Sequence, residues 1–418
     1  MTIDNTDVRR VALISVHGCP MMRPGMRAAG GMNVYLKHLV ESLGDQGICV
    51  DLFTRNHEPD GPQIITLGPR ARVIHIPAGP ELTPKENVYY HLPAFLQGIG
   101  EFLEREELSY DLVHSHYWLS GWVGCQVAHA WDVPHVSTFH TLSLVKRLTF
   151  EAQEPPVRES IERDVANQAD LVVAFSEEES ALLQSAYGVA ADQVRVTTEG
   201  VDLGLFSPRN KQEARNHLGL EPETPTILYV GRLEAFKGTH VLLRAMARLR
   251  DVAKLRLVVV GGGGSEDPEA AALHQLAEEM GVADRVIWQN AVPQEALPDY
   301  YAAADVCAVP SYHESFGLVA LEAMACGTPV VAASVGGLRS LVVDGETGLL
   351  VDPNTPELFA QRLQTVLDDP AMQSRMSIAA HQRAALFPWH TAASEVASVY
   401  RQVMTRTGHI PTAVPCAG

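Results

Sequence analysis

The chain has 418 residues, of which 46% are hydrophobic and 20% are charged, and its formal net charge at pH 7 is -18. This composition excludes a disordered chain. The length is sufficient for two or more domains of ordinary size. The negative charge argues against a nucleic-acid partner, because a phosphate backbone is bound by basic surfaces.

The first half of the chain alternates short apolar runs with helical patterns. Such alternation is typical of βαβ units that build a parallel sheet. The predicted strands cover residues 10–16, 49–54, 71–76, 112–115, 135–138 and 171–175. The predicted helices cover residues 33–43, 89–105 and 158–167.

The pattern starts again after residues 203–226, a polar stretch with three prolines that we interpret as a connector. The next predicted strands cover residues 226–231, 255–260, 285–288, 306–309 and 329–332, and a helix is predicted at residues 240–250. Residues 389–404 have a helical pattern with no strand after them, so we expect this helix to pack back across the domain junction.

These elements predict an α/β protein with two doubly wound, Rossmann-like domains that face a central cleft. The expected boundaries are residues 1–205 and 206–388, with residues 389–418 returning to the first domain. No apolar stretch approaches the ~20 residues of a membrane-spanning helix, and no signal peptide is evident. The cysteines lack metal-ligand spacing, and Cys49 and Cys307 lie in apolar strand patterns typical of buried thiols. We therefore expect a soluble, cytoplasmic protein.

Two carboxylates in the second half are placed to bind hydroxyl groups. Glu314 follows the apolar run of residues 304–310, and Glu322 lies within the helical pattern of residues 318–325. Ligands of open α/β sheets bind at the carboxyl ends of the strands. An ionised carboxylate only accepts hydrogen bonds, which suits sugar or ribose hydroxyls. The alternative is that both glutamates are simply solvated.

Two other segments suit the binding of phosphate groups. Gly30 and Gly31 precede the first long helix, whose amino end offers free N–H groups to an anion. Arg232 and Lys237 follow the first strand of the second half and are able to grip a diphosphate. A tight turn and a pair of solvated cations are the alternatives. The glycine-rich loop after residue 260 fails the dinucleotide fingerprint because Glu266 replaces its third glycine, so NAD is not expected.

Histidines follow two strands of the first half, at residues 114, 116 and 140. Metal binding is one interpretation, but no Cys or carboxylate lies at ligand spacing, so we expect buried, hydrogen-bonded histidines and no essential metal. Lys85, Lys146, Arg147 and Arg158 are the cations nearest these loops, and most such cations are simply solvated.

Together these segments resemble the retaining glycosyltransferases of family 4, which have the two-domain GT-B fold. The resemblance covers essentially the whole chain. It is carried most strongly by residues 314–331, by Gly336 and Gly337, and by residues 344–350. It implies an acceptor-binding first domain, a second domain that binds a nucleotide sugar such as a UDP-sugar, and transfer of a hexosyl unit.

The resemblance also implies residue roles. Arg232 and Lys237 would hold the diphosphate, Glu314 the donor-sugar hydroxyls, and Glu322 the ribose. His140 would lie near the reacting carbon. The remaining donor contacts would come from His17, Gly31, Phe316, Gly317 and Leu318. The outcome would be retention of configuration, with the leaving diphosphate taking the acceptor proton and no protein base.

Within the family, the likeness is greatest to members that transfer N-acetylglucosamine to inositol 3-phosphate. It rests on residues 30–33, 116–121, 140–141 and 310–317. It implies that the acceptor is bound by Asn33 and by a phosphate cradle made of Lys85, Tyr117, Thr141 and Arg158. Ala28 replaces an expected acidic residue, which bears on polyol recognition, and Thr198 and Glu199 depart from the usual connector motif.

Several alternatives stay open at this point. Sucrose-phosphate synthases share much of the framework, so fructose 6-phosphate competes as acceptor, and glucose competes with N-acetylglucosamine as the transferred unit. Residues 142–150 mix apolar side chains with Lys146 and Arg147, which would fit a membrane-surface enzyme with a lipid acceptor. A non-catalytic nucleotide-sugar binder is a further alternative. A homodimer is the default oligomer.

Overall fold

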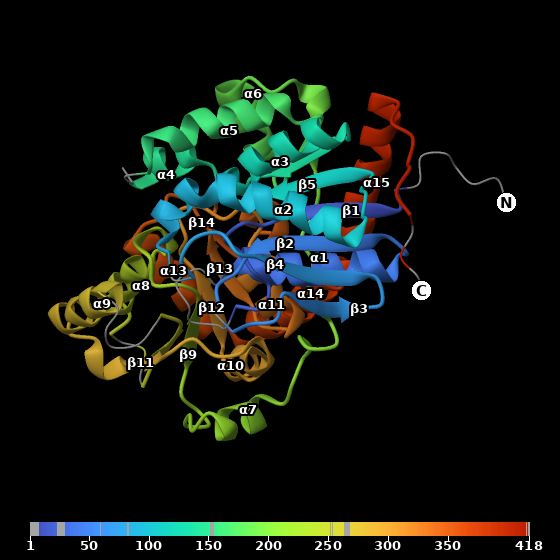
Figure 1. Ribbon diagram of the computed structural model, residues 1–418. Coiled ribbons are helices and arrows are strands. Elements are labelled where there is room, and N and C mark those ends of the chain that lie inside the picture. The colour runs from blue at the N-terminus through green and yellow to red at the C-terminus, as the bar shows by residue number, and fades with distance from the viewer. Residues whose placement is uncertain are drawn as a thin grey trace. The chain divides into compact units, whose positions relative to one another are not determined.

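The computed structural model describes residues 8–22, 30–58, 60–81, 83–150, 154–250, 252, 254–262, 268–414 and 416. The chain divides into two compact units. The first unit holds the described residues up to 198 together with those from 389 onward, and the second holds those from 199 to 388. Figure 1 shows both units, with helices and strands labelled where there is room.

The first unit is built on an eight-stranded sheet with the order β3-β4-β2-β1-β5-β6-β7-β8. All neighbouring strands are parallel except β3 and β4, which are antiparallel. The strands are β1 (Arg10–Ile14), β2 (Cys49–Arg55), β3 (Ile64–Gly68), β4 (Ala71–Ile76), β5 (Leu112–His116), β6 (His135–Thr138), β7 (Leu171–Ala174) and β8 (Val194–Val196). From β1 the chain adds strands first on one side, as β2 and β4, and then on the other side, beginning with β5. The boundary between β1 and β5 is therefore the switch point of a doubly wound sheet.

Helices pack on both faces of this sheet. They are α1 (Gly31–Asp45), α2 (Leu92–Glu106), α3 (Trp118–Trp131), α4 (Ser143–Phe150), α5 (Pro156–Gln168), α6 (Glu177–Tyr187) and α15 (Trp389–Thr407), with 3-10 turns at Lys85–His91 and Ala191–Gln193. Ala12 and Ile14 of β1 join the core cluster that includes residues of α2, α3 and α5. Because successive side chains of a strand point to opposite faces, Leu13 lies on the other face.

Local sequence explains where the helices begin and end, and α6 is a clear example. The Ser176 hydroxyl accepts a hydrogen bond from the Glu179 N–H, and three acidic residues in the first turn complement the helix dipole. Gly188 ends the helix in the left-handed conformation.

The last helix, α15, belongs to the first unit and packs against α1 (Figure 1). Its first residue, Trp389, stacks on His38 with ring centroids 4.9 Å apart, and the Tyr400 hydroxyl lies 2.8 Å from His114 Nδ1. Beyond α15, Cys416 forms a disulfide with Cys49 of β2. The interpretation of Cys49 as a free buried thiol is therefore wrong. Sequence spacing does not signal this pair, because its two cysteines lie 367 residues apart.

The second unit contains a six-stranded, wholly parallel sheet with the order β11-β10-β9-β12-β13-β14. This is the Rossmann order, with its switch point between β9 and β12. The strands are β9 (Thr226–Val230), β10 (Arg256–Val260), β11 (Val286–Gln289), β12 (Val306–Val309), β13 (Val330–Ala333) and β14 (Gly348–Val351).

The helices of this unit are α7 (Lys211–His217), α8 (Thr239–Met246), α9 (Pro268–Glu279), α10 (Leu297–Ala303), α11 (Leu318–Ala325), α12 (Leu338–Leu341), α13 (Pro356–Asp368) and α14 (Pro370–Ala384), with 3-10 turns at Ala235–Lys237, Ala283–Arg285 and Gln294–Ala296. The expected connector contains α7, which the sequence reading missed. Its buried Arg215 donates to Asp305 (2.9 Å), a long-range contact that local sequence does not reveal. Among the described residues, no helix has the length and apolar character needed to cross a membrane.

Candidate active site

In the second unit, the predicted donor residues cluster at the switch point of the sheet. Arg232 and Lys237 lie on the loop between β9 and α8, and Glu314 lies on the loop between β12 and α11. β9 and β12 are neighbours in the sheet, so both loops leave the same edge side by side. This is the position at which doubly wound sheets bind their ligands.

Lys237 and Glu314 form an ion pair at the centre of this cluster. Lys237 Nζ donates to Glu314 Oε1 at 2.7 Å, and the Ser311 hydroxyl donates to the same oxygen at 2.7 Å. Burial alone would raise the pKa of Glu314, but the ammonium of Lys237 and these two hydrogen bonds outweigh it and hold the pKa below its ordinary value. Glu314 is therefore an ionised hydrogen-bond acceptor at neutral pH.

Arg232 lies close to Lys237 of this ion pair. Its guanidinium pairs with Glu234, and its Cζ lies 5.9 Å from the ring centroid of Phe236. Lys237 Nζ lies 5.2 Å from that centroid. The two predicted diphosphate cations thus flank one aromatic ring.

Glu322 has a different electrostatic setting. It lies on α11 and is buried, with Oε2 accepting from the Tyr301 hydroxyl at 2.8 Å and Oε1 from Gln294 Nε2 at 3.2 Å. Burial raises the pKa of Glu322 to about 7, despite the opposing effect of these hydrogen bonds. Its charge state therefore changes within the physiological pH range.

Phe316, Gly317 and Leu318 form the entry to α11, whose first N–H groups have no partner within the helix. Gly317 has φ of +111°, and a Cβ there would lie 2.6 Å from Leu338 Cδ2. A Cβ on Gly336 would lie 1.9 Å from the Glu314 carbonyl oxygen. Both glycines are therefore required for the backbone to pass this closely around the glutamate loop.

In the first unit, the structure brings the predicted acceptor residues together around the ring of Tyr117. Lys85 Nζ lies 4.3 Å and Arg158 Cζ 4.7 Å from the ring centroid, and Arg158 Nη2 donates to the Thr141 carbonyl at 2.6 Å. Tyr117 has φ of 77° and ψ of 158°. Only glycine adopts that region readily, and holding another residue there costs about 1–3 kcal/mol, a strain that clusters at functional sites.

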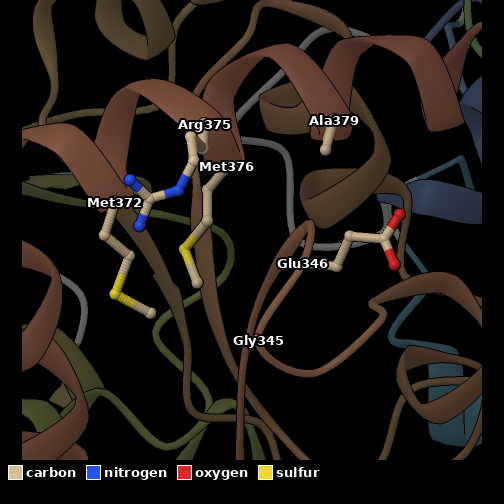
Figure 2. A pocket seen from close by; sticks show the side chains of 6 residues that line it. All are labelled: Gly345, Glu346, Met372, Arg375, Met376 and Ala379. Atoms are coloured by element: carbon tan, nitrogen blue, oxygen red, sulfur yellow. The ribbon is translucent and has the colours of Figure 1, made fainter.

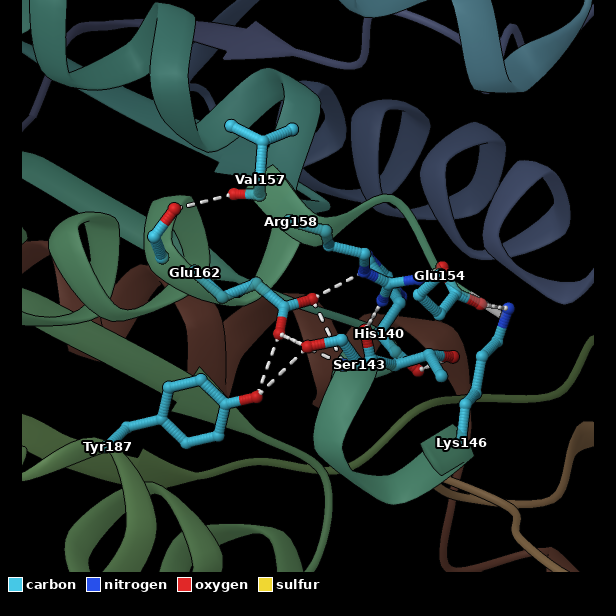
Figure 3. A network of polar contacts seen from close by, with 10 residues as sticks. His140, Ser143, Lys146, Glu154, Val157, Arg158, Glu162 and Tyr187 are labelled. Atoms are coloured by element: carbon cyan, nitrogen blue, oxygen red, sulfur yellow. Dashed lines mark hydrogen bonds and ion pairs between the residues drawn. The ribbon is translucent and has the colours of Figure 1, made fainter. Parts of the chain in front are cut away.

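Arg158 is the fully buried centre of a charged network, shown in Figure 3. Its Nε donates to Glu162 Oε1 and its Nη1 to Glu154 Oε2, both at 2.6 Å. Glu162 also accepts from Ser143 and from the Tyr187 hydroxyl, and Glu154 pairs with Lys146 at 2.9 Å. The arginine is held in place by two carboxylates that sequence reasoning did not single out.

The sequence contains a signal for the carboxylates Glu154 and Glu162. Both stand four residues from Arg158 (i, i+4), the spacing of ion pairs along a helix. That signal is weak alone, because surface helices carry the same spacing. Glu162 is fully buried and Glu154 is partly buried, and this burial depends on packing that sequence does not show. On α4, Lys146 and Arg147 both pair with carboxylates, which weakens the case for an anionic membrane surface as their partner.

His140 is a neutral, partly buried side chain in the same unit. Burial lowers the pKa of His140 to about 3. Its Nε2 lies 3.0 Å from His116 Nδ1, and its ring packs edge-on against Tyr35. Its φ of +60° is a second positive value at a predicted site residue other than glycine. The imidazole is thus fixed as a hydrogen-bonding group and is not a cation at neutral pH.

The other predicted first-unit residues lie near the start of α1. The His17 ring centroid is 4.5 Å from that of Tyr117, and Gly31 is the exposed first residue of α1. The buried amide of Asn33 accepts from the Gly30 N–H and donates to the Cys19 carbonyl at 2.7 Å. This amide therefore ties Cys19 to Gly30 within the segment that joins β1 to α1. Ala28 and Glu266 lie outside the described residues.

A hollow on the second unit lies apart from these residues. Figure 2 shows its lining by Gly345, Glu346, Met372, Arg375, Met376 and Ala379. None of these belongs to the predicted donor or acceptor set, and no cluster of reactive groups lines it. We assign it no role.

Comparison with known proteins defines the class. Residues 30–200 match the glycosyl transferase 4-like domain, and residues 210–383 match the glycosyl transferases group 1. The chain therefore belongs to this glycosyltransferase family, with the GT-B architecture of two Rossmann-like domains, and is a nucleotide-sugar-dependent transferase. The predicted fold class and family are confirmed.

Individual relatives refine the likeness. The D-inositol 3-phosphate glycosyltransferase of Corynebacterium efficiens is 42% identical over 406 residues, covering 95% of this chain and 96% of the relative. The protein of the same name from Thermobispora bispora is 42% identical over 413 residues, covering 96% of both chains. Sucrose-phosphate synthase from Thermosynechococcus elongatus is 38% identical, with a TM-score of 0.88, covering 95% of this chain and 100% of that one. Anabaena HepE, solved with UDP and glucose, is 22% identical with a TM-score of 0.75, covers 94% of this chain and 100% of that one, and supports the fold alone.

Proposed function

We propose that the chain is a retaining hexosyltransferase that moves glucose or N-acetylglucosamine from a UDP-sugar to a small phosphorylated acceptor, with inositol 3-phosphate as the favoured acceptor. The observation that carries the proposal is the convergence of Lys85 and Arg158 on the Tyr117 ring, beside Thr141. Two cations at the Tyr117 ring, one of them bound to the backbone carbonyl of Thr141, suit a phosphate group. The D-inositol 3-phosphate glycosyltransferases among the relatives support the inositol 3-phosphate assignment.

Each donor residue has a proposed task that follows from its surroundings. Arg232 and Lys237 neutralise the diphosphate as the bond to the sugar breaks, which is where charge develops in the transition state. Glu314, ionised and accepting, takes hydrogen bonds from the sugar hydroxyls. Neutral His140 offers a hydrogen bond to the sugar. The acceptor proton passes to the leaving diphosphate, and no residue is assigned as a base.

Fructose 6-phosphate is the second candidate acceptor. It is favoured by the likeness to a sucrose-phosphate synthase at 38% identity and a TM-score of 0.88. Both acceptors present a phosphate, so the cradle around Tyr117 suits either one. Location in the cytoplasm and homodimer formation stay predictions.

Replacing Lys85 by alanine is expected to raise KM for the phosphorylated acceptor about tenfold to a hundredfold, since hydrogen bonds to charged groups contribute about 1.5–3 kcal/mol. Slow hydrolysis of the donor in the absence of acceptor should not change. Arg147→Ala is the matched control, because Arg147 pairs with Glu159 on the surface. Equal KM values for Lys85→Ala and the unaltered enzyme would contradict the phosphate cradle.

UDP binding is expected to strengthen as pH rises from about 6 to 8. Below the pKa of about 7, Glu322 is protonated, and it must lose its proton to accept hydrogen bonds from both ribose hydroxyls. Affinity should therefore fall by up to about tenfold per pH unit below that pKa. Titration calorimetry in buffers of different ionisation enthalpy would also detect the released proton. The slope and proton release should both vanish in Glu322→Gln. Their persistence in that variant would assign the proton to another group.

The same raised pKa has the opposite consequence for the stability of the ligand-free protein. The folded state binds the Glu322 proton more tightly than the unfolded chain does. Its contribution to the free energy of unfolding is therefore fully present below the unfolded pKa and is lost as pH rises through about 7.

A further inference from the structure

Three potential metal ligands gather at the carboxyl ends of neighbouring strands in the first unit. Cys19 lies in the loop after β1, His57 follows β2, and His75 lies near the end of β4. These strands are adjacent and parallel, so their ends share one edge of the sheet. One ligand atom from each side chain lies within 4.8 Å of the other two. Across the described part of the chain, this is the one group of three or more such side chains with that property.

The separation between the Cys19 and His75 ligand atoms is close to that around a tetrahedral ion. With Zn–S of about 2.3 Å and Zn–N of about 2.05 Å, a sulfur and a nitrogen ligand lie about 3.6 Å apart, and two nitrogens lie about 3.4 Å apart. Cys19 Sγ and His75 Nε2 are 3.3 Å apart. The His57 and His75 rings are tilted, with centroids 5.4 Å apart. Small side-chain shifts would bring the three atoms onto one ion.

Hydrogen bonds orient the ligands as a metal site requires. His75 Nδ1 lies 3.0 Å from the Pro62 carbonyl oxygen. That oxygen only accepts, so Nδ1 carries the proton and the Nε2 lone pair faces Cys19. An imidazole N–H donated to a backbone carbonyl is the usual support of a metal-bound histidine. The Met21 N–H, 3.4 Å from Cys19 Sγ, points a donor at the sulfur.

A simple hydrogen bond from the Cys19 thiol to His75 is the alternative account. It leaves the position of His57 unexplained, because His57 contacts the Arg55 backbone and yet one of its ring nitrogens lies within 4.8 Å of the Cys19 and His75 ligand atoms. One bound ion would account for all three side chains. Glu58 directly follows His57 in the chain, and its negative charge acts on the pKa of Cys19, His57 and His75 alike; its carboxylate lies outside the group of atoms within 4.8 Å of one another.

We propose that Cys19, His57 and His75 bind a zinc-type divalent transition-metal ion, with Glu58 or water as the fourth ligand. Thiolate and imidazole together select such ions over magnesium or calcium. Burial raises the pKa of the Cys19 thiol to about 12, so its proton passes to solvent when the ion binds. The ion ties together the loops after β1 and β2. Because the Cys19 carbonyl accepts from Asn33, it also steadies the start of α1. No step of sugar transfer passes through it.

Cobalt titration of the metal-stripped full-length protein tests the proposal. We expect one equivalent of Co²⁺ to produce thiolate-to-cobalt charge transfer and the visible absorption of a four-coordinate ion, and Zn²⁺ to displace it. Cys19→Ser should abolish the charge transfer and weaken binding by at least about 100-fold, since loss of an outer support alone costs 10–100-fold. His57→Gln changes a partly exposed side chain and should weaken binding without unfolding the chain.

Cys125→Ser is the matched control. Cys125 Sγ lies 3.7 Å from His135 Nδ1, so it forms a cysteine–histidine pair that lacks a third ligand in the described residues. This variant should keep the full cobalt spectrum. Bound Zn²⁺ should also raise the Tm of the unaltered protein but not that of Cys19→Ser. The proposal is overturned if the unaltered protein gives no charge-transfer absorption, or if that absorption survives in Cys19→Ser while the variant remains folded.

Discussion

Replacing Lys237 by alanine is expected to lower kcat/KM for the nucleotide sugar by about 10²–10³-fold, the usual effect of removing one preorganised group that stabilises transition-state charge. Two losses combine. The departing diphosphate loses a cation, and Glu314 loses the 2.7 Å ion pair that orients it. Because the leaving-group charge grows as the bond breaks, most of the loss should fall on kcat.

Steady-state kinetics with Lys254→Ala as control would measure this effect. Lys254 is exposed and only loosely paired with Glu221 at 3.8 Å, so its removal should leave kcat/KM unchanged. Lys237→Arg keeps the charge and should retain part of the activity. A loss below about tenfold in Lys237→Ala would remove this lysine from the transition-state account.

Replacing Arg158 by alanine is expected to lower the free energy of unfolding by about 3–5 kcal/mol, because it leaves a buried carboxylate without its partner. Glu162 is fully buried, and its 2.6 Å pair with Arg158 is the main source of opposing charge. The change also removes the guanidinium that lies over Tyr117. Acceptor affinity should therefore fall together with stability.

Urea unfolding of Arg158→Ala and of Arg163→Ala would separate a buried ion pair from a surface one. Arg163 lies on the same helix, is 47% exposed and pairs with Glu159 at 3.7 Å, so its loss should cost about 1 kcal/mol or less. The double variant Arg158→Met with Glu162→Gln should recover much of the stability, but not the acceptor affinity. If Arg158→Ala is no more harmful than Arg163→Ala, the network does not hold the unit together.

Central strands were predictable from sequence because they are buried on both faces and read as apolar runs. The core strands β1, β9 and β12 each lie where such a run indicates, within about two residues at either end. Edge strands carry less of this signal. β3 is half-exposed, β8 has three residues, and both were missed. β14 was not predicted as a strand, and most of it lies in the family motif of residues 344–350.

The candidate site likewise has residues that were predictable from sequence and residues that were not. The Glu314 and Glu322 segment and the Arg232 and Lys237 pair stand in short motifs that can be read directly. Burial of the Arg158 network depends on tertiary packing. Cys19, His57 and His75 come from two separate loops and from strand β4, with no ligand spacing along the chain, so only the fold brings them together.

The proposed function requires that this transferase recognise its acceptor by a phosphate group. The direct measurement is UDP release from UDP-glucose and UDP-N-acetylglucosamine, with inositol 3-phosphate, fructose 6-phosphate and the unphosphorylated form of each as acceptors. We predict a kcat/KM at least about 100-fold higher for a phosphorylated acceptor than for its unphosphorylated form, corresponding to about 2.7 kcal/mol. Equal turnover with and without the phosphate would contradict the role assigned to Lys85, Tyr117, Thr141 and Arg158.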